Sequence, residues 1–331
     1  MFSSDCSVIE YRASAFTRKG GFKTLSLLAK NNVYGKRKKS VRSQSIAVSR
    51  HTIQMEIQNR RYTAVMPKVP QKSAALLLVF HGSNQTGEKM RAFSGNVFDE
   101  LVQKHGWVVV YPDGYKGHWN DARLSSNFPT RKAGIDDVAF TKALIHEIRA
   151  KNDIDGNKVY LAGYSNGGQM VIRLIHEWPY PFAGAMIIAA TQPVAANFLA
   201  VSRETSLPIL LLHGTSDPIV PYSGGMASLW GWHPRGLGLS AHETAHYYAQ
   251  RNHIASRPTI RTLEQGRKNG LTVTVEAYSE TGKYPITFVS IEGGGHVVPN
   301  PYKKAPFLLG KTATHVNSAT LLWDFFEQQQ Q

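Results

Sequence analysis

The stretch KVYLAGYSNGGQM, residues 158–170, joins an apolar run to a helical pattern through a Gly-x-Ser-x-Gly turn. An apolar run of this length is typical of a strand that is covered on both faces of a sheet. A turn tight enough to lift the Ser165 hydroxyl above such a sheet leaves no room for side chains at Gly163 and Gly167, and it strains the backbone at the serine. We therefore predict that Ser165 is a nucleophile on a strand–turn–helix corner.

Similar apolar runs and helical patterns alternate along most of the chain. Buried strands are predicted at 74–80, 107–111, 158–162, 185–190, 208–212 and 286–291, and an earlier pair of strands at 52–57 and 62–66. Helices are predicted at 93–105, 136–152, 167–177, 240–252 and 316–328. Asp136 and Asp137 begin the second of these helices, where carboxylates favour the helix dipole and can cap it. The alternation predicts an α/β fold, with a mostly parallel central sheet, helices on both faces and function at the carboxyl ends of the strands.

Two later strand ends carry an acid and a base for Ser165. Asp217 follows the strand at 208–212 in the loop HGTSDP, and His296 follows the strand at 286–291 after three glycines. A serine hydroxyl is a poor nucleophile until a base takes its proton, and the base needs a carboxylate to fix its tautomer. Singly, a loop aspartate or a lone histidine is explained by a structural role. Their joint order after Ser165 is that of α/β-hydrolases, so we predict that the three residues form a catalytic triad.

The loop HGSN, residues 81–84, follows the strand at 74–80 and is the candidate oxyanion hole. Attack on a carbonyl needs hydrogen-bond donors for the developing negative charge, each worth about 2.7–4 kcal/mol. We assign these donors to the backbone N–H groups of Ser83 and of Asn166, the residue after the nucleophile. A plain tight turn is the structural alternative for this loop, and we expect His81 to support the loop rather than to titrate in catalysis.

The combined motifs resemble those of the polyhydroxybutyrate-depolymerase-like esterases, a family that also includes feruloyl and acetylxylan esterases. The matching segments are FHGSNQTG at 80–87, YPDG at 111–114, WNDAR at 119–123, DDVAF at 136–140, VYLAGYSNGGQM at 159–170, HGTSDPIVPYSGG at 213–225, EGGGHVVP at 292–299 and LLWDFF at 321–326. The resemblance implies an α/β-hydrolase fold and a serine esterase whose triad of Ser165, Asp217 and His296 works through an acyl-enzyme. It also implies that Trp119 and Asn120 contact the substrate, with packing and a turn as the structural alternative.

The choice of ester stays open at this point. Short hydroxyalkanoate esters of the polyhydroxybutyrate type and acyl or feruloyl esters on polysaccharide both suit an aromatic rim formed by Trp119, Trp230 and Trp232. The loop at 226–239, which holds two of these tryptophans, is expected to reshape the pocket. The domain also lacks the cysteines that many family members carry. Because no polymer-binding domain follows, we favour a small or oligomeric ester over solid polyester.

The net charge of +15 is concentrated near the N-terminus. Residues 1–50 hold 11 Lys/Arg against Asp5 and Glu10, so we predict a basic, disordered extension at 1–50 and an esterase domain at 51–331. The extension can be read as a transit-like segment, a polyanion-binding arm or a solvated leader. The second hypothesis for function is a catalytically silent hydrolase-fold protein that binds polyanions through this leader. A complete triad argues against it, and we expect no nucleic-acid partner.

Other chemistries and locations find less support in the sequence. The single cysteine, Cys6, excludes an internal disulfide framework and a thiolate zinc site. The H-E-x-x-H match at 242–246 lacks the glycine and histidine of a metzincin, so we expect no metal or cofactor. No apolar run is long enough to span a membrane, and no signal peptide is recognisable. The resemblance favours an extracellular or periplasmic location, with the cytoplasm as the alternative, and the oligomeric state stays open.

Overall fold

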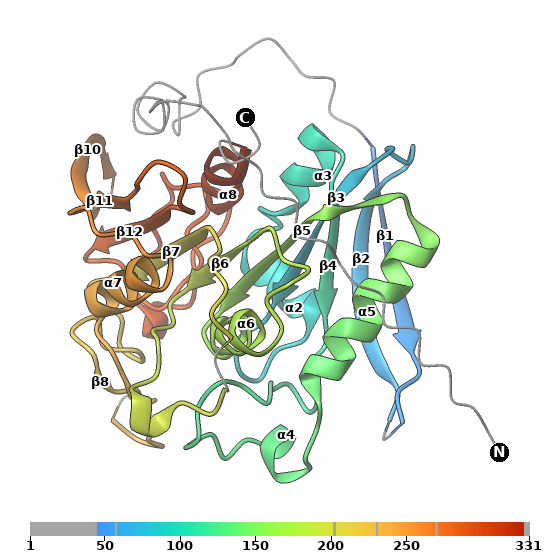
Figure 1. Ribbon diagram of the computed structural model, residues 1–331, viewed down its shortest axis with the longest axis horizontal. Helices are drawn as coiled ribbons and strands as arrows, with labels where there is room; N and C mark the ends of the chain where they lie inside the picture. The colour runs from blue at the N-terminus through green and yellow to red at the C-terminus, as the bar shows by residue number, and fades with distance from the viewer. Residues whose placement is uncertain (1–44, 57, 201–202, 230, 269–270, 328–331) are drawn as a thin grey trace, which may run out of the picture.

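A ten-stranded sheet forms the centre of the molecule (Figure 1). Its strands, in spatial order, are β1 (Ile46–Ile53), β2 (Arg60–Pro67), β4 (Val108–Pro112), β3 (Ala74–Phe80), β5 (Ile154–Tyr164), β6 (Gly184–Ile188), β7 (Ile209–Gly214), β12 (Ile286–Glu292), β11 (Leu271–Tyr278) and β10 (Thr259–Lys268). The strands from β4 to β12 in this order run parallel to their neighbours, and antiparallel strands complete both edges. The prediction of an α/β fold with a mostly parallel sheet is therefore confirmed.

The computed structural model describes residues 45–56, 58–200, 203–229, 231–268 and 271–327. Residues 1–44, which make up most of the predicted extension and carry the polyanion-binding hypothesis, lie outside the described residues, as does Trp230. The first strand begins at Ile46, earlier than the predicted 52–57. Its register pairs Ile46 with Pro67 and Ile53 with Arg60, so the hairpin's paired residues end at Ile53 and resume at Arg60.

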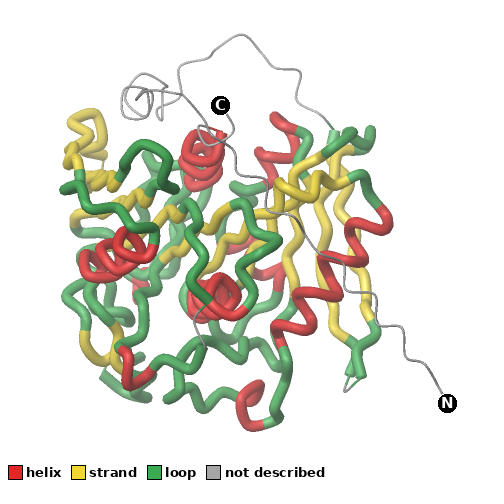
Figure 2. The backbone as a smooth tube through the Cα atoms, in the orientation of Figure 1, coloured by secondary structure: helices red, strands yellow, loops and turns green. Residues whose placement is uncertain are grey.

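Helices cover both faces of the sheet, as expected (Figure 2). One face carries α5 (Asp137–Lys151), α6 (Asn166–Glu177) and α7 (Ala241–Arg251), and the other carries α2 (Gly87–Phe93), α3 (Asp99–His105) and α8 (Ser318–Glu327). The smaller elements are α4 (Pro129–Lys132), η1 (Ala195–Asn197), η2 (Phe307–Leu309) and the two-stranded sheet of β8 (Gly225–Met226) and β9 (Leu237–Gly238). Each face of the large sheet has its own buried apolar cluster. None of the helices in the described part of the chain is long and apolar enough to cross a membrane.

Several elements differ from the sequence prediction for local reasons. The helix predicted at 93–105 forms only from Asp99, as α3, because Gly95 and Asn96 adopt left-handed backbone angles with φ of +68° and +56° and separate it from α2, which was not predicted. The predictions also omitted β10 and β11. β11 is half-buried along part of its length, so its apolar residues alternate with polar ones and form no continuous run.

The course of the chain brings two loops with candidate site residues to one place. From β3 the chain passes to β4 on one side, and it later returns to β5 on the other side of β3. Ligand sites in such sheets lie at the carboxyl ends of the strands where the direction of winding reverses. The loop after β3 carries HGSN and the loop after β5 carries Ser165, so the fold places both at this reversal point.

A buried ion pair ties the edge of the sheet to α5. Arg60 at the start of β2 donates from Nη2 to Asp137 Oδ1 at 2.7 Å, and both side chains are buried. The second oxygen, Asp137 Oδ2, accepts the backbone N–H of Asn120 at 2.7 Å. Of the two aspartates predicted to begin α5, only Asp136 is the cap, since it accepts the N–H of Ala139. Asp137 instead anchors two other parts of the chain.

The two adjacent aspartates should therefore differ in their effect on stability. We expect Asp137→Ala to lower the free energy of unfolding by about 3–5 kcal/mol, because it leaves the Arg60 charge buried without a partner. We expect Asp136→Ala to cost only about 1 kcal/mol, the loss of one helix cap. Urea unfolding of both variants measures the difference. Equal losses, or a larger loss for Asp136→Ala, would contradict this account of the ion pair.

Candidate active site

Ser165 stands at a strained corner between β5 and α6. Its backbone has φ +55° and ψ −118°, which an L-residue adopts only when its surroundings enforce it. A Cβ at Gly163 would lie 2.3 Å from the carbonyl oxygen of Gly167, and a Cβ at Gly167 would lie 2.2 Å from that of Phe80. Only glycine fits at these two positions. The corner leaves the Ser165 side chain partly exposed at the floor of a cleft.

His296 connects Ser165 with Asp217. Ser165 Oγ lies 2.8 Å from His296 Nε2, and His296 Nδ1 lies 2.7 Å from Asp217 Oδ2. His296 is only 2% exposed, and the hydroxyl of Tyr164 donates to the backbone carbonyl of His296 at 2.8 Å. The structure thus brings together the three residues predicted from three separate strand ends.

The environment of Asp217 keeps this carboxylate ionised. Asp217 Oδ1 accepts the backbone N–H groups of Ile219 and Val220, both at 2.8 Å. Burial alone would raise the pKa of Asp217, but the charge of His296 and its hydrogen bond, with a contribution from His213, hold the pKa below its usual value. An ionised Asp217 accepts the Nδ1 proton of His296 and leaves Nε2 as the acceptor for the serine proton.

The two predicted oxyanion donors belong to the residue after Ser165 and to a loop that approaches it. Within the described part of the chain, neither the Ser83 nor the Asn166 backbone N–H has a hydrogen-bond acceptor. Asn166 is the first residue of α6, where N–H groups have no partner inside the helix and the dipole favours negative charge. The loop that carries Ser83 is close by, since a Cβ at Gly82 would lie 3.5 Å from the Cβ of Ser165. Both groups are therefore available to an oxygen bound next to the serine.

His81 fixes the shape of this loop. Its Nδ1 lies 2.7 Å from the carbonyl oxygen of Gly82, and its Nε2 accepts the N–H of Gly114 at 2.8 Å. The Nε2 atom must be unprotonated to accept that hydrogen bond, and burial lowers the pKa of His81 to about 4. His81 is a neutral support at physiological pH, in agreement with its expected role.

Neither Trp119 nor Asn120, which were predicted to contact the substrate, lines the cleft. Trp119 is fully buried, and its Nε1 donates to the carbonyl oxygen of His81 at 2.9 Å. Its backbone N–H donates to Asn166 Oδ1 at 2.9 Å. The Asn120 side chain donates to the carbonyl oxygen of Ile135 at 2.8 Å. Trp119 therefore supports the two site loops from behind, whereas Asn120 is tied to the segment that leads into α5.

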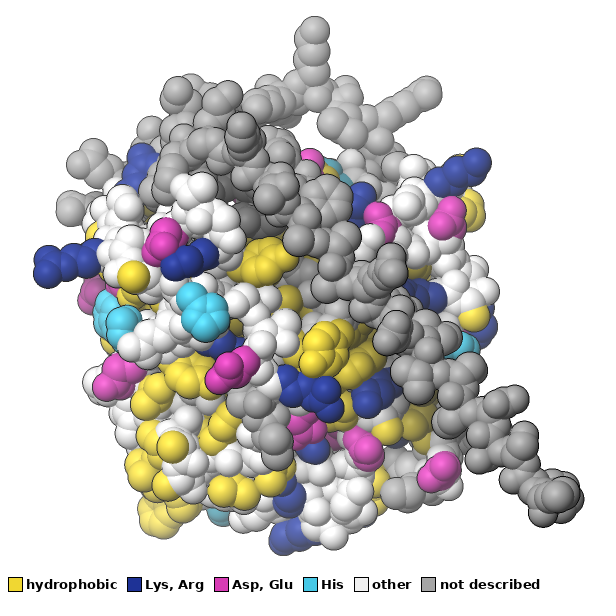
Figure 3. Space-filling model, in the orientation of Figure 1, with side chains coloured by type: hydrophobic (Ala, Val, Ile, Leu, Met, Phe, Trp, Pro, Cys, Tyr) yellow, Lys and Arg dark blue, Asp and Glu magenta, His cyan; other side chains and the backbone are white. Residues whose placement is uncertain are grey.

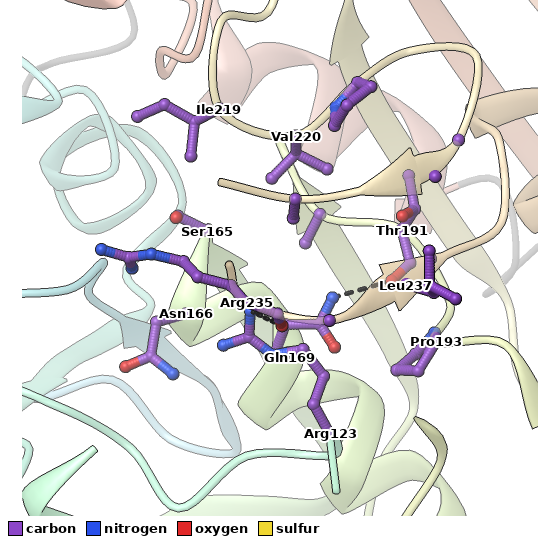
Figure 4. Close-up of a pocket in the computed structure, with 17 residues that line it drawn as sticks. Arg123, Ser165, Asn166, Gln169, Thr191, Pro193, Ile219, Val220, Arg235 and Leu237 are labelled. Atoms are coloured by element: carbon purple, nitrogen blue, oxygen red, sulfur yellow. Dashed lines mark hydrogen bonds between the residues drawn. The ribbon is translucent and has the colours of Figure 1, made fainter. Parts of the chain in front are cut away.

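The cleft beside Ser165 contains two arginines that the sequence analysis did not single out (Figure 4). Arg123 belongs to the WNDAR segment, whose place in the motif was an available signal. Arg235 belongs to the loop at 226–239, and its place in the cleft depends on the path of that loop. The cleft is lined by Arg123, Ser165, Asn166, Gln169, Ala190, Thr191, Pro193, Ile219, Val220, Pro221, Gly224, Gly225, Ala227, Arg235, Gly236, Leu237 and Gly238.

Apolar side chains surround much of this cleft. Ile219, Val220 and Leu237 line it. Leu237 is also exposed to solvent, as is Met226 next to the lining residues Gly225 and Ala227. Apolar side chains gather over the β8 region at the lower left of the face in Figure 3. Of the tryptophans predicted as an aromatic rim, Trp232 is 76% exposed, but it does not line the cleft. Among the described residues, the apolar part of the cleft lining is therefore aliphatic rather than aromatic.

The H-E-x-x-H segment has partners that account for its first histidine. His242 on α7 lies 2.9 Å from Glu276 Oε1 through Nδ1 and 3.0 Å from the hydroxyl of Tyr222 through Nε2. The glutamate at the second position, Glu243, completes the capping box of α7 with Ser240. These contacts assign the segment to the packing and capping of a helix.

Comparison with known proteins places the chain in a family. Residues 62–229, half of the chain, match the family described as phospholipase/carboxylesterase. A protein of Nocardia uniformis subsp. tsuyamanensis named as an esterase, NocK, is 28% identical over 275 residues, which cover 78% of this chain and 75% of that protein. Feruloyl esterase B of Piromyces equi is 27% identical over 236 residues, which cover 68% of this chain and 40% of that protein.

Two further similarities are more limited: one covers only part of the chain, and the other is a similarity of fold. The poly(3-hydroxybutyrate) depolymerase of Ralstonia pickettii is 33% identical over 141 residues, which cover 40% of this chain and 28% of that protein. The solved acetyl xylan esterase from Aspergillus awamori superposes with a TM-score of 0.56 at 14% identity, covering 84% of this chain and 99% of that chain. This last likeness concerns the fold alone.

The sheet order and the strained serine corner define an α/β-hydrolase. Within that class, the chain belongs to the phospholipase/carboxylesterase family. It is accordingly a carboxylic ester hydrolase, and the resemblance inferred from its motifs is confirmed at this level.

Substitution of Trp119 tests its position behind the site. We expect Trp119→Phe to lower kcat several-fold with little change in KM, because it leaves the His81 carbonyl without its donor and loosens the loop that carries Ser83. Steady-state kinetics on p-nitrophenyl esters of two chain lengths provide the measurement. A large rise in KM that depends on the acyl chain would instead restore the substrate-contact interpretation.

The neutral state of His81 should also be visible in the pH dependence of stability. The folded-state pKa of about 4 lies below the usual value of about 6.5 for a histidine, so the unfolded chain binds a proton first as the pH falls. Stability is therefore lost as the pH falls from about 6.5 to 4. Over this pH window, the unfolding free energy of His81→Gln should fall less steeply with falling pH than that of the native protein, because the variant takes up as much as one proton fewer on unfolding. An unchanged slope would show that His81 is not buried in its neutral form.

Proposed function

We propose that the chain hydrolyses carboxylic esters through an acyl-enzyme formed on Ser165. The observation that carries the proposal is the continuous hydrogen-bonded chain from Ser165 Oγ through His296 to Asp217, with distances of 2.8 and 2.7 Å. A structural serine does not need a base at its hydroxyl, and a structural histidine does not need a buried carboxylate behind it. Together with the strained corner and two free N–H groups, the arrangement supplies each part that acyl transfer requires.

The proposed reaction proceeds in two halves. His296 Nε2 takes the hydroxyl proton while Ser165 Oγ bonds to the ester carbonyl carbon, and the N–H groups of Ser83 and Asn166 bind the resulting oxyanion. His296 then gives its proton to the departing alcohol oxygen as the carbon–oxygen ester bond breaks. In the second half, water attacks the acyl-enzyme carbonyl, His296 takes a water proton and returns it to Ser165 Oγ, and the carboxylic acid leaves.

For the substrate we propose a small or oligomeric carboxylic ester. The names of the relatives cover feruloyl, acetylxylan and poly(3-hydroxybutyrate) esters, but the chain spans less than half the length of those three proteins. The aliphatic lining near Ile219, Val220 and Leu237 suits a short hydroxyalkanoate or acyl group. A panel of hydroxybutyrate oligomers, methyl ferulate and acetylated xylan distinguishes the classes.

Two substitutions test the proposed triad. Ser165→Ala should remove nearly all hydrolysis of p-nitrophenyl esters while the protein stays folded, because the nucleophile is lost but the strained turn accepts alanine as it accepts serine. Asp217→Asn should lower kcat by about 10⁴, because an amide stabilises the wrong tautomer of His296. Circular dichroism provides the control for folding. Unchanged turnover in Ser165→Ala would end the proposal.

A further inference from the structure

The guanidinium of Arg235 is a cation without a carboxylate partner in the proposed active-site cleft. Among the described residues no acidic side chain forms an ion pair with it, and none of the residues that line the cleft is acidic. A guanidinium stays charged at any physiological pH and carries five N–H donors. A partly buried guanidinium without a counter-ion has lost water without gaining an ionic partner.

Arg123, the other arginine of the cleft, provides the comparison. Its Nε donates to Asp121 Oδ1 at 3.1 Å, and its Nη2 also contacts Asp121 Oδ2, so its charge is matched by a buried carboxylate. The same carboxylate accepts the side-chain amide of Asn166 at 2.6 Å. Asp121 is therefore fully engaged, which leaves Arg235 as the cation of the cleft that has no such partner.

The position of Arg235 is fixed next to the reacting atoms. Its Nη1 donates to Ser83 Oγ at 3.0 Å, and Ser83 carries one of the two proposed oxyanion donors. Its carbonyl oxygen accepts a hydrogen bond from Arg123 Nη1 at 3.3 Å, and the ring of Phe128 lies 5.2 Å from its guanidinium carbon. Figure 4 shows the guanidinium reaching across the cleft toward Ser165 and Asn166. An anionic group of a substrate bound there would be separated from the scissile ester by only a few covalent bonds.

We propose that this enzyme prefers esters that carry a free carboxylate close to the scissile bond, and that Arg235 binds this carboxylate. The proposal rests on the proposed function of Ser165. A carboxylate matches the planar donor fork of a guanidinium, and such charge-assisted pairs are roughly twice as strong as neutral hydrogen bonds. The aliphatic lining of the cleft takes the rest of the substrate, so the preferred class is a short ester with one anionic end.

The electrostatics of the cleft agree with this assignment. Burial, and then the positive charge of Arg123, lower the pKa of Arg235 below its usual value, and the charge of Asp121, which forms no ion pair with it, offsets only part of this shift. Both effects act against a cation that has no partner, and a bound carboxylate relieves both of them. A role confined to the oxyanion would help every ester to the same extent, because every ester develops the same charge on its carbonyl oxygen. Discrimination between an anionic and a neutral ester therefore separates the two roles.

The test compares two substrates with the same scissile bond. One is the linear dimer of 3-hydroxybutyrate with its free terminal carboxylate, and the other is the same dimer with that group converted to a carboxamide. We expect the native enzyme to cleave the carboxylate form with a kcat/KM at least about tenfold higher, equivalent to about 1.4 kcal/mol. In Arg235→Gln the ratio should fall to about one, and in Arg235→Lys it should be intermediate, because an ammonium keeps the charge but loses the fork.

A matched variant controls for the net charge of the protein. Arg257→Gln removes one cation from an exposed position outside the cleft and should keep the native ratio. Equal cleavage of the two dimers by the native enzyme, an equal loss on both in Arg235→Gln, or a reduced ratio in Arg257→Gln would each overturn the inference. Such results leave the esterase proposal standing, since that proposal fails only if neither dimer nor any p-nitrophenyl ester is hydrolysed in a Ser165-dependent manner.

Discussion

Two backbone segments approach so closely at the end of β5 that a methyl group cannot enter between them. A Cβ at Gly167 would lie 2.2 Å from the carbonyl oxygen of Phe80, the last residue of β3. This contact locks the start of α6 against the end of β3, and so holds the corner of Ser165 beside the loop that follows Phe80. The proposed nucleophile and oxyanion donors are adjacent because of this backbone packing, before any side chain is considered.

Buried polar side chains then set the fine geometry around that contact. Trp119 bonds the His81 carbonyl through its indole and the Asn166 side chain through its backbone, so one residue links the two loops that carry the proposed oxyanion donors. Asp121 holds Asn166 and Arg123 together. Every member of this network has its main hydrogen bonds satisfied within the protein, which makes it rigid. A rigid frame suits a site whose donors must be in place before the charge develops.

The sequence predicted most of the fold and of the candidate site, but not the cleft. Apolar runs locate the parallel strands, because a strand buried on both faces requires apolar residues. The Gly-x-Ser-x-Gly turn locates Ser165, because the tight turn has no room for a Cβ on either side of the serine. Trp119 illustrates what the sequence could not distinguish, since a tryptophan that packs behind a site and one that lines it occur in the same sequence motif. The position of Arg235 depends on the path of the loop at 226–239, which no periodicity encodes. Leu271, Val273 and Val275 in β11 did carry a period-two signal that the prediction overlooked.

The walls of the cleft and its floor come from different parts of the chain. Ser165 and Asn166 belong to the junction of β5 and α6, whereas Arg235 and Leu237 belong to the segment around β9, outside the ten-stranded sheet. A change in length or composition of that segment does not have to disturb the packing of the sheet. Evolution, or a protein engineer, could therefore exchange the selective surface of this scaffold as a separate module while its chemical apparatus is inherited intact.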